Sequence, residues 1–409
     1  MKKSPYLSAQ EAAEALGISI STLYAYVSRG MIHSEASGGD PRARRYSAED
    51  VERLKSRKES RHDPEIAVKS ALHLGMPVLE SAISLIENGR LYYRGRDAVE
   101  LARKATVEQV AALLWAGDLD ADTSAWFQSP LEIPQNFLDI SESIQSMLHF
   151  ERFQAILPFV SSNDPAAYDL RPKAVAATGA RILRVMAIIA GSDEGAEGIA
   201  AKIAGIAGGL TYDPKAVELI SAALILCADH ELNVSAFTVR CVASAQATPY
   251  AAVIAGLAAL SGAKHGGHTE RVEAFLREAG KPENVYDTMA ARLRRGEMIP
   301  GFSQPLYPNG DPRGRALLEW TAVAYPDSLA LAFAEAAAQA GKSLLGDYPT
   351  IDLGLVILSR ALGLPQGGAL ALFGIGRTIG WIGHAIEQYQ TDRLIRPRAR
   401  YTGERPTSG

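Results

Sequence analysis

The sequence predicts an all-α fold in two unequal parts, a small N-terminal domain and a much larger helical one. Two observations lead to this prediction. Beyond about residue 70 the chain consists of long apolar-periodic segments rich in Ala and Leu, with few runs of β-branched residues. The start of the chain is different, because eleven Lys and Arg face eight Asp and Glu through position 62. That leaves this segment near +3 and the remainder near −7.

Residues 1–60 have the helix boundaries of a helix-turn-helix. Ser8 and Glu11 form a capping-box pattern, which predicts the start of a short helix. Gly17 supplies the turn that ends it, and Ser19 caps a second helix that runs to about Arg29. Two short helices joined in this way are typical of the helix-turn-helix motif.

A turn at residues 38–41, Gly-Gly-Asp-Pro, lies between short extended pieces. It is followed by a basic run and by a third helix, which Ser47 caps together with Asp50. The turn and its basic flank predict a wing. We place a linker at 61–69, within the polar, charged run SRKESRHDPEI that Pro64 interrupts, and a second domain at 70–409.

The helical domain is expected to contain seven long helices. Their predicted ranges are Val107–Trp115, Pro172–Ile189, Lys215–Ala247, Ala251–Leu260, Ala316–Ala340, Gly354–Leu362 and Ala369–Gln390.

Composition limits the function classes. With 47% hydrophobic and 22% charged residues the 409-residue chain is globular, and its formal charge of −4 gives no overall sign of nucleic-acid binding. Cys227 and Cys241 lie in apolar helical stretches, where small buried hydrophobes are expected rather than a disulfide, so a cytoplasmic location fits. The N-terminus has no signal-peptide pattern, and apolar runs such as 251–260 are shorter than a bilayer requires, so no membrane segment is expected.

The stretch YLSAQEAAEALGISISTLYAYVSRGMI, followed by RRYSAEDVERL, resembles the winged helix-turn-helix domains of MerR-type regulators and excisionases. The resemblance implies double-stranded DNA as a partner, with the second helix in the major groove and the wing on the backbone. It makes Ser21, Thr22, Tyr24 and Tyr26 candidate groove contacts, and Arg42, Arg44 and Arg45 candidate phosphate contacts. The alternative is a relict or protein-interaction module whose basic face is merely solvated.

From about Ser70 to Gly403 the chain resembles citrate synthases. The matching pieces, in the family's own order, are GRLYYRGRDAVELARKATVEQVAALLWAGDL, LCADHELNVSAFTVR, SGAKHGGHTE, GFSQPLYPNGDPRGRALLE, YPTIDLGLVILSRALGLP, FGIGRTIGWIGHAIEQ and LIRPRARYTG. The resemblance implies large and small helical subdomains and a homodimer whose active site is completed across the interface. It also implies condensation of acetyl-CoA or propionyl-CoA with oxaloacetate to citrate or 2-methylcitrate and CoA, without a metal or other cofactor.

This chemistry needs a base beside a thioester, a donor to the enolate oxygen, and cations for a dicarboxylate. By the resemblance, Asp352 is the base and His265 is the donor. His230 and three arginines bind oxaloacetate, the last arginine reaching over from the partner subunit: Arg313, Arg377 and Arg396.

Each of these residues also has a plainer interpretation. Outside its motif Asp352 would be read as a helix cap, His230 as a helix-end histidine and the arginines as surface charges. A metal site at His265 and His268 is disfavoured, because no cluster of thiols or carboxylates accompanies them. His384 is expected to pack at a helix interface.

One position departs from the family. Where its members carry a histidine that contacts the ketone oxygen of oxaloacetate, this chain has Gln304, whose amide can donate a hydrogen bond but cannot shuttle a proton. Pro305 and Pro308 stand where many members have basic or hydroxyl-bearing residues, which puts the usual CoA phosphate contacts in doubt.

Two functions therefore remain: an enzyme, and a ligand-sensing transcription regulator that has kept the oxaloacetate-binding residues but lost turnover. Release of CoA thiol from acetyl-CoA plus oxaloacetate would separate them.

Overall fold

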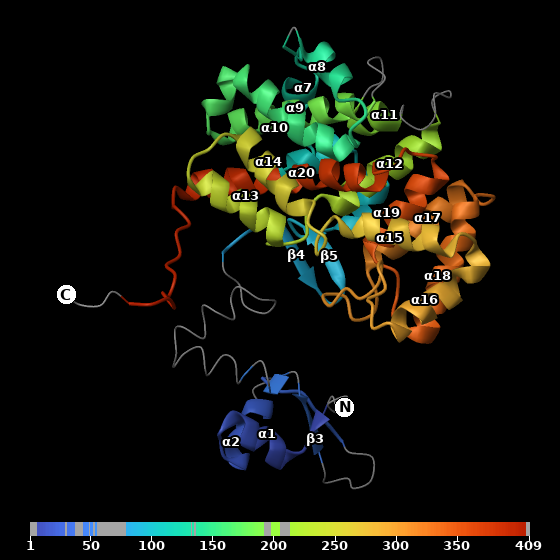
Figure 1. Cartoon of the computed structure of the whole chain (residues 1–409). Coiled ribbons are helices and arrows are strands. Elements are labelled where there is room, and N and C mark those ends of the chain that lie inside the picture. The colour runs from blue at the N-terminus through green and yellow to red at the C-terminus, as the bar shows by residue number, and fades with distance from the viewer. Residues whose placement is uncertain are drawn as a thin grey trace. The chain divides into compact units, whose positions relative to one another are not determined.

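The chain forms two compact units, Met1–Glu80 and Ser81–Gly409, in the computed structural model shown in Figure 1. The residues that the structure describes are 6–28, 31–36, 44–48, 50, 51, 54, 79–131, 133, 134, 136–191, 198–204 and 213–405. The predicted linker at 61–69, the turn at 38–41 and Arg42 lie outside the described residues.

The N-terminal unit contains the predicted helix pair. Its elements are β1 (Tyr6–Leu7), α1 (Ala9–Leu16), α2 (Ile20–Ser28), β2 (Ser34–Ala36) and β3 (Arg44–Ser47). The capping box of Ser8 and Glu11 is present, Gly17 ends α1 in the left-handed conformation with φ 58°, and Ser19 Oγ accepts the Thr22 N–H at 3.2 Å. Both predicted helix starts are therefore confirmed.

The strands of this unit form one antiparallel sheet in the order β1-β3-β2. Pairing of Glu35 with Arg45 sets the register of β2 against β3, which are the two extended pieces expected beside the wing turn. The sequence did not predict β1. At the end of β3, Ser47 Oγ accepts the Asp50 N–H at 3.2 Å, as the predicted cap requires. The core beneath is made by Ala12, Ala13, Leu16, Leu23, Ile32, Tyr46 and Val51.

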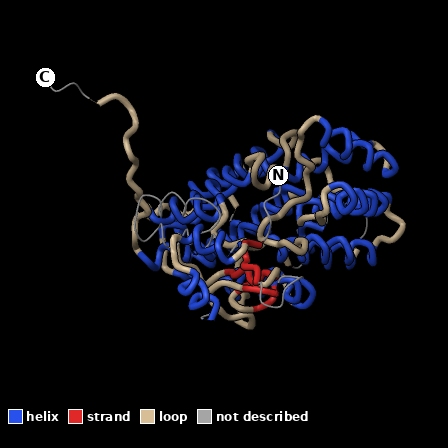
Figure 2. The backbone as a smooth tube through the Cα atoms, turned by 90° about the horizontal axis from the view of Figure 1, so that it is seen from below, coloured by secondary structure: helices blue, strands red, loops and turns tan. Residues whose placement is uncertain are grey.

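The larger unit is built almost entirely of helices, as Figure 2 shows. They are α5 (Ala98–Lys104), α6 (Val107–Ala116), α7 (Ser124–Phe127), α8 (Phe137–Ser143), α9 (His149–Ser162), α10 (Pro172–Ile189), α11 (Ile199–Ala204), α12 (Pro214–Cys227), α13 (Val234–Ser244), α14 (Pro249–Leu260), α15 (His268–Ala279), α16 (Val285–Arg294), α17 (Pro312–Ala324), α18 (Leu329–Leu344), α19 (Ile351–Ala361) and α20 (Gly368–Thr391). Short 3-10 helices occupy Pro165–Tyr168 and Pro282–Asn284. A small antiparallel sheet, β4 (Ser84–Glu87), β5 (Arg90–Tyr93) and β6 (Arg96–Asp97), was not predicted.

Five of the seven predicted helices are confirmed to within a few residues at each end, and two are wrong as single helices. The range 215–247 divides into α12 and α13, because Glu231 takes a positive φ of 53° and Asn233 caps a new helix by accepting the N–H groups of Ser235 and Ala236. The range 316–340 divides into α17 and α18 at Pro326, where Ser328 caps α18.

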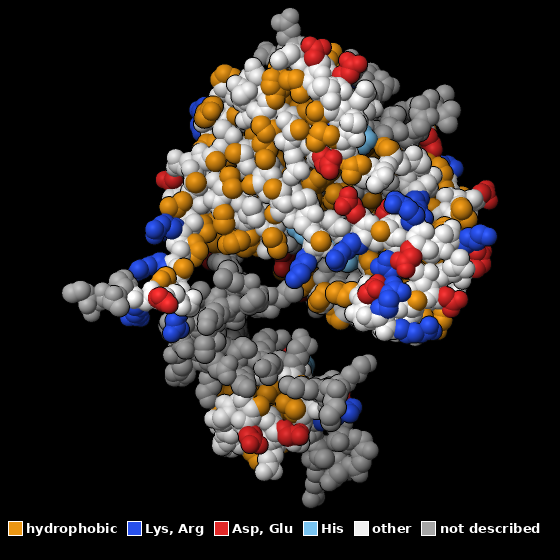
Figure 3. Space-filling model, in the orientation of Figure 1, with side chains coloured by type: hydrophobic (Ala, Val, Ile, Leu, Met, Phe, Trp, Pro, Cys, Tyr) orange, Lys and Arg blue, Asp and Glu red, His pale blue; other side chains and the backbone are white. Residues whose placement is uncertain are grey.

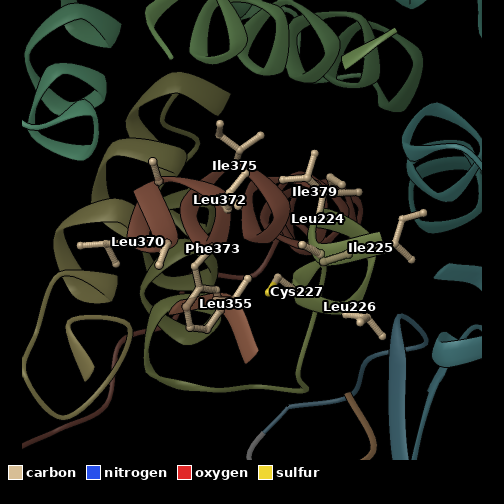
Figure 4. Close-up of a cluster of buried hydrophobic side chains, with 14 of the residues drawn as sticks. Leu224, Ile225, Leu226, Cys227, Leu355, Leu370, Leu372, Phe373, Ile375 and Ile379 are labelled. Carbon is tan, nitrogen blue, oxygen red and sulfur yellow. The ribbon is translucent and has the colours of Figure 1, made fainter. Parts of the chain in front are cut away.

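Helix α20 lies at the centre of the larger unit and packs against α10, α12, α13, α14 and α19. Figure 4 shows two of its side chains, Phe373 beside Leu355 of α19 and Ile379 beside Leu224 of α12. By length and composition α20 could cross a membrane, so the expectation that every apolar run is too short is wrong for this helix. Its apolar stretch is nevertheless buried inside the domain, as in a core helix.

Candidate active site

The predicted residues come from helix ends and turns around α20. His230 lies in the turn between α12 and α13, and His265 in the turn between α14 and α15. Arg313 opens α17, Asp352 lies in the first turn of α19, and Arg377 is on α20 itself. The structure brings these five segments to one region, since Arg313, Arg377 and His265 act electrostatically on His230, and Arg313 acts on Asp352.

His230 is buried, and its Nε2 lies 3.0 Å from the Tyr307 hydroxyl. Burial lowers its pKa well below the ordinary value, and the positive charges of Arg313 and Arg377 lower it further. The ring is therefore neutral at pH 7, and each of its nitrogens is either a donor or an acceptor.

The His265 ring forms a hydrogen bond with the hydroxyl of Ser235. Its Nε2 lies 2.8 Å from Ser235 Oγ, and the Ser235 hydroxyl donates to Asn233 Oδ1 at 2.7 Å. Burial, with a smaller effect of Arg377, lowers the pKa of His265 to about 4, so this imidazole is also neutral at pH 7. A Cβ at Gly266 would lie 2.6 Å from Leu260 Cγ, so the loop needs this glycine to pack on the end of α14.

Arg313 is buried beside its own counter-ion. Its Nε and Nη2 donate to the two carboxylate oxygens of Asp311 at 3.0 and 2.8 Å. Burial disfavours the guanidinium charge, but Asp311 outweighs this and raises the pKa of Arg313. Asp311 also accepts the Ile351 N–H at 3.1 Å, which ties the start of α17 to the start of α19.

Arg377 is likewise buried. Its Nε donates to the Cys227 carbonyl at 2.6 Å, and its guanidinium lies over the Phe373 ring, 4.9 Å from the centroid. Burial lowers the pKa of Arg377, and the negative charge of Asp229 opposes that shift.

Asp352 accepts a hydrogen bond from Thr350 Oγ1 at 3.2 Å. Burial raises the pKa of this carboxyl, and the nearby His268 and Arg313 side chains offset part of the effect. A carboxylate with a raised pKa is a stronger base than an exposed one, which is what removal of a weakly acidic proton requires.

Gln304 lies on a strained loop at the edge of this region. The preceding residue, Ser303, has φ 68° and donates its hydroxyl to Asp347 at 2.8 Å. The Gln304 carbonyl accepts the Tyr307 N–H at 3.0 Å. His230 has Tyr307, not Gln304, as its hydrogen-bond partner.

The loop of Gln304 is fixed by its neighbours. His268 Nε2 accepts the Gly301 N–H at 3.1 Å, and the Gly301 carbonyl accepts the Thr350 N–H at 2.9 Å. His265 and His268 therefore have different partners and do not converge.

Arg396 is not brought to this region. It lies in the exposed segment after α20, which Figure 1 shows running away from the unit. Just before it, the Ile395 N–H still donates to Ser244 Oγ at 3.0 Å. Within one chain the structure thus unites His230, His265, Arg313, Asp352 and Arg377, and leaves Arg396 outside.

Sequence reasoning missed several supporting residues: Tyr307, Ser235, Asp311 and Thr350. Asp311 could have been found, because Asp before Pro at a helix start is an N-cap signal. Tyr307 and Ser235 could not, because the histidines they contact lie 77 and 30 residues away.

On the N-terminal unit, the side chains predicted to contact DNA differ in solvent exposure and in the hydrogen bonds they already make. Ser21 and Thr22 each place a hydroxyl 2.8 Å from Ser19 Oγ, whereas Tyr24 is 54% exposed. Tyr26 is partly buried against the small core. Of the arginines, Arg44 is exposed on β3, and Arg45 pairs with Glu35 at 2.7 Å and lies over the Tyr6 ring.

Comparison with known families agrees with this arrangement. Residues 72–398 match the family model described as "Citrate synthase, C-terminal domain". The chain belongs to the citrate synthase family. Members of the citrate synthase family use acetyl-CoA as a substrate and need no cofactor. Residues 6–59 match a family described as "Helix-turn-helix domain".

Characterised citrate synthases and their relatives are similar over most of the larger unit. Citrate synthase 2 of Bacillus subtilis is 29% identical over 80% of this chain and 94% of its own length. The 2-methylcitrate synthase of Mycobacterium tuberculosis is 27% identical over 80% and 89%. The crystal structure of citrate synthase from Thermotoga maritima has 27% identity and a TM-score of 0.70, covering 82% of this chain and 96% of that one.

Proposed function

We propose that this protein condenses acetyl-CoA or propionyl-CoA with oxaloacetate and then hydrolyses the thioester, releasing CoA and citrate or 2-methylcitrate. One observation supports this above the rest. A partly buried carboxyl with a raised pKa, Asp352, is near enough to buried Arg313 to feel its charge, and a partly buried neutral imidazole, His265, is likewise near buried Arg377. These groups supply the base, the donor and the cations that the reaction requires.

In the proposed mechanism Asp352 takes the α-proton of the acyl thioester. His265 donates to the thioester oxygen, where negative charge develops. In the structure the Ser235 hydroxyl donates to Asn233 Oδ1, so the proton of the neutral His265 ring lies on Nε2. The mechanism therefore requires that the Ser235 proton turn from Asn233 to His265 Nε2 when the thioester binds, which places the ring proton on Nδ1 for donation to the substrate. The nucleophilic carbon then forms a bond to the ketone carbon of oxaloacetate, the ketone oxygen takes up a proton to become a hydroxyl, and water cleaves the C–S bond to release the thiol.

We propose that oxaloacetate is held by Arg313, Arg377 and neutral His230. A dicarboxylate placed between two buried guanidiniums gains charge-assisted hydrogen bonds that water would otherwise weaken. His230 Nε2, which lies against the Tyr307 hydroxyl, would donate to a carboxylate once substrate enters.

We propose a homodimer in which a second copy supplies Arg396. The segment after α20 is exposed and leaves the unit beside α13, through the bond from Ile395 to Ser244. Figure 3 shows many hydrophobic side chains over α10, α13 and α14, and Val234 at the start of α13 is 65% exposed. A two-fold dimer through this face would bury these side chains and lead each terminal segment towards its partner.

A second candidate function is a regulator that binds oxaloacetate and double-stranded DNA without turnover. The helix-turn-helix match at residues 6–59 and the replacement of a family histidine by Gln304 support it. The exposed Tyr24 on α2 is the groove contact that we favour, and Arg44 on β3 is the phosphate contact. The free thiols of Cys227 and Cys241 fit the reducing cytoplasm in which either function would operate.

The deciding experiment measures thiol release from acetyl-CoA and from propionyl-CoA with oxaloacetate, beside calorimetric binding of oxaloacetate alone. Turnover supports the enzyme, and the ratio of kcat/KM for the two thioesters names the product. Oxaloacetate binding without thiol release makes the regulator the better proposal. A protein that neither binds oxaloacetate nor releases thiol contradicts both.

A further inference from the structure

We propose that Asp229 and His384 are a buried pair of positioning residues that fix His230 and Arg377 in the geometry that oxaloacetate requires. The proposal rests on the oxaloacetate site described above. Neither residue belongs to that site, yet both are completely buried, and Nε2 of His384 lies 3.1 Å from Asp229 Oδ1.

The turn before α13 is attached to α20 at three successive residues. Arg377 Nε donates to the Cys227 carbonyl at 2.6 Å, the Gly380 N–H donates to the Ala228 carbonyl at 3.0 Å, and His384 pairs with Asp229. Residues 377, 380 and 384 follow one another at spacings of three and four, so they lie on one face of the helix. The next residue along the turn is His230, and its position is therefore set by this face of α20.

A second element holds the same turn from the other side. Ser84 of β4 donates its hydroxyl to Asp229 Oδ2 and accepts the Glu231 N–H at 2.9 Å. Glu231 in turn accepts the Ile86 N–H at 3.0 Å. His230 thus lies between two residues that are each anchored, Asp229 to α20 and β4, and Glu231 to β4.

The pair also balances charge. Burial lowers the pKa of Arg377, and the negative carboxylate of Asp229 raises it and so helps to keep the guanidinium protonated. The nearby Arg313 has a different counter-ion, Asp311. The bond to Asp229 is the one side-chain hydrogen bond of His384 among the described residues, since its Nδ1 is buried without a partner there. Removing the imidazole therefore leaves Asp229 Oδ1 unsatisfied and breaks the side-chain contact between Asp229 and α20, while Ser84 still donates to Oδ2.

The test compares His384→Ala with His384→Gln in the full-length protein. The glutamine amide nitrogen can occupy the place of Nε2 and still donate to Asp229, while alanine cannot. We expect oxaloacetate to bind about tenfold or more weakly to His384→Ala by calorimetry, with the KM for oxaloacetate raised more than kcat is lowered. His384→Gln should restore most of the affinity.

The matched control is Asp164→Asn, which weakens an ion pair between buried Asp164 and partly buried Arg181 in the same unit. Asp164 pairs with Arg181 and accepts the Tyr250 hydroxyl at 3.1 Å, and none of these residues belongs to the proposed site. We expect this variant to lose thermal stability and keep its oxaloacetate affinity. Equal affinity of His384→Ala and the parent, or equal losses in His384→Ala and Asp164→Asn, would overturn the proposal.

A second readout does not depend on oxaloacetate. In the ligand-free protein labelled with 15N-histidine, the ring signals of His230 can be assigned by their absence in His230→Gln. The positioning role requires that these signals shift in His384→Ala and return towards their original place in His384→Gln. Signals that do not move in His384→Ala would contradict the positioning role, whether or not the parent protein binds oxaloacetate. A parent protein that binds no oxaloacetate would contradict the proposed substrate instead.

Discussion

Asp352 is the residue whose chemistry has the simplest test. Replacement by Asn keeps the shape of the side chain and removes the base, so we expect Asp352→Asn to lower the rate of CoA release by about 10²–10⁴-fold. Oxaloacetate affinity should stay within a few-fold, because Arg313 and Arg377 hold their own contacts to Asp311 and Cys227. Thiol release and calorimetry measure the two effects. A variant with parental turnover would remove Asp352 from its role.

Gln304 is tested by introducing the histidine that the resemblance to citrate synthases implies at this position. Gln304→His should raise turnover about tenfold, since loss of one such donor costs about 10²–10³-fold and the amide already recovers part. Ser303, at φ 68°, holds the loop in a conformation that suits glycine. The double variant with Ser303→Gly should therefore gain at least as much and be more stable to heat.

Thiol release at saturating substrate measures both variants. If neither gains activity while both still bind oxaloacetate, the site is more than one substitution from the family's chemistry, and the regulator becomes the better proposal.

Helix α20 lies very close to the turn before α13 at Gly380, and this close approach positions His230. A Cβ at Gly380 would clash with the Ala228 carbonyl and lie 2.7 Å from Asp229 Oδ1. We expect Gly380→Ala to lower the free energy of unfolding by about 1–3 kcal/mol. It should also weaken oxaloacetate binding, because the turn that carries His230 must move.

Gly354→Ala on α19 is the matched control. Its Cβ would lie 3.4 Å or more from its neighbours, and alanine favours the helix by about 0.5–1 kcal/mol. Denaturant unfolding and calorimetry compare the two variants. Equal stability of Gly380→Ala and the parent protein would show that the contact is looser than its geometry implies.

The same elements show what the sequence could and could not predict. Helices with local signals, such as the capping box of Ser8 and Glu11, were predicted almost to the residue. The break at Glu231 was missed, because apolar periodicity continues across it and the Asn233 cap was not recognised; in the structure that cap and the contacts of Asp229 with α20 and β4 fix the turn. Strands β4 to β6 are too short to show a period, and their pairing is a tertiary event.

The candidate site shows the same limit. Family motifs assigned roles to His265 and Asp352, and the structure adds what orients them, Ser235 and Thr350. Those contacts depend on how helices meet, which no local pattern in the sequence specifies.

At the scale of the whole molecule, the proposed dimer predicts complementation between two defective chains. Arg396→Ala and Asp352→Asn should each be inactive alone. After random subunit exchange, about half of the dimers are heterodimers. Each heterodimer has one site with an intact Asp352 from one chain and an intact Arg396 from the other, and a second site that lacks both. About a quarter of parental thiol release should therefore return. Exchange verified by mass, without recovery of activity, would place each complete site within one chain.

The division into two units predicts that their functions separate. Removal of residues 1–62 should abolish binding to double-stranded DNA and leave thiol release and the unfolding of the larger unit unchanged, because its core contains none of the removed residues. Binding by the full-length protein should weaken steeply with salt, which gel-shift titrations at several ionic strengths would measure. DNA binding that survives the truncation would assign the N-terminal unit to a protein partner instead.

The central place of α20 also determines the order in which the protein can fold as it is made. The ribosome synthesises α6, α9, α10, α12, α13, α14 and α19 before the helix that they surround. Their apolar faces therefore stay exposed on the nascent chain until residues 368–391 emerge, whereas the buried core seen among the described N-terminal residues is already complete at Val51. A chain that stalls before α20 combines a finished N-terminal unit with an unfinished helical one, and chaperones and proteases would treat it as misfolded.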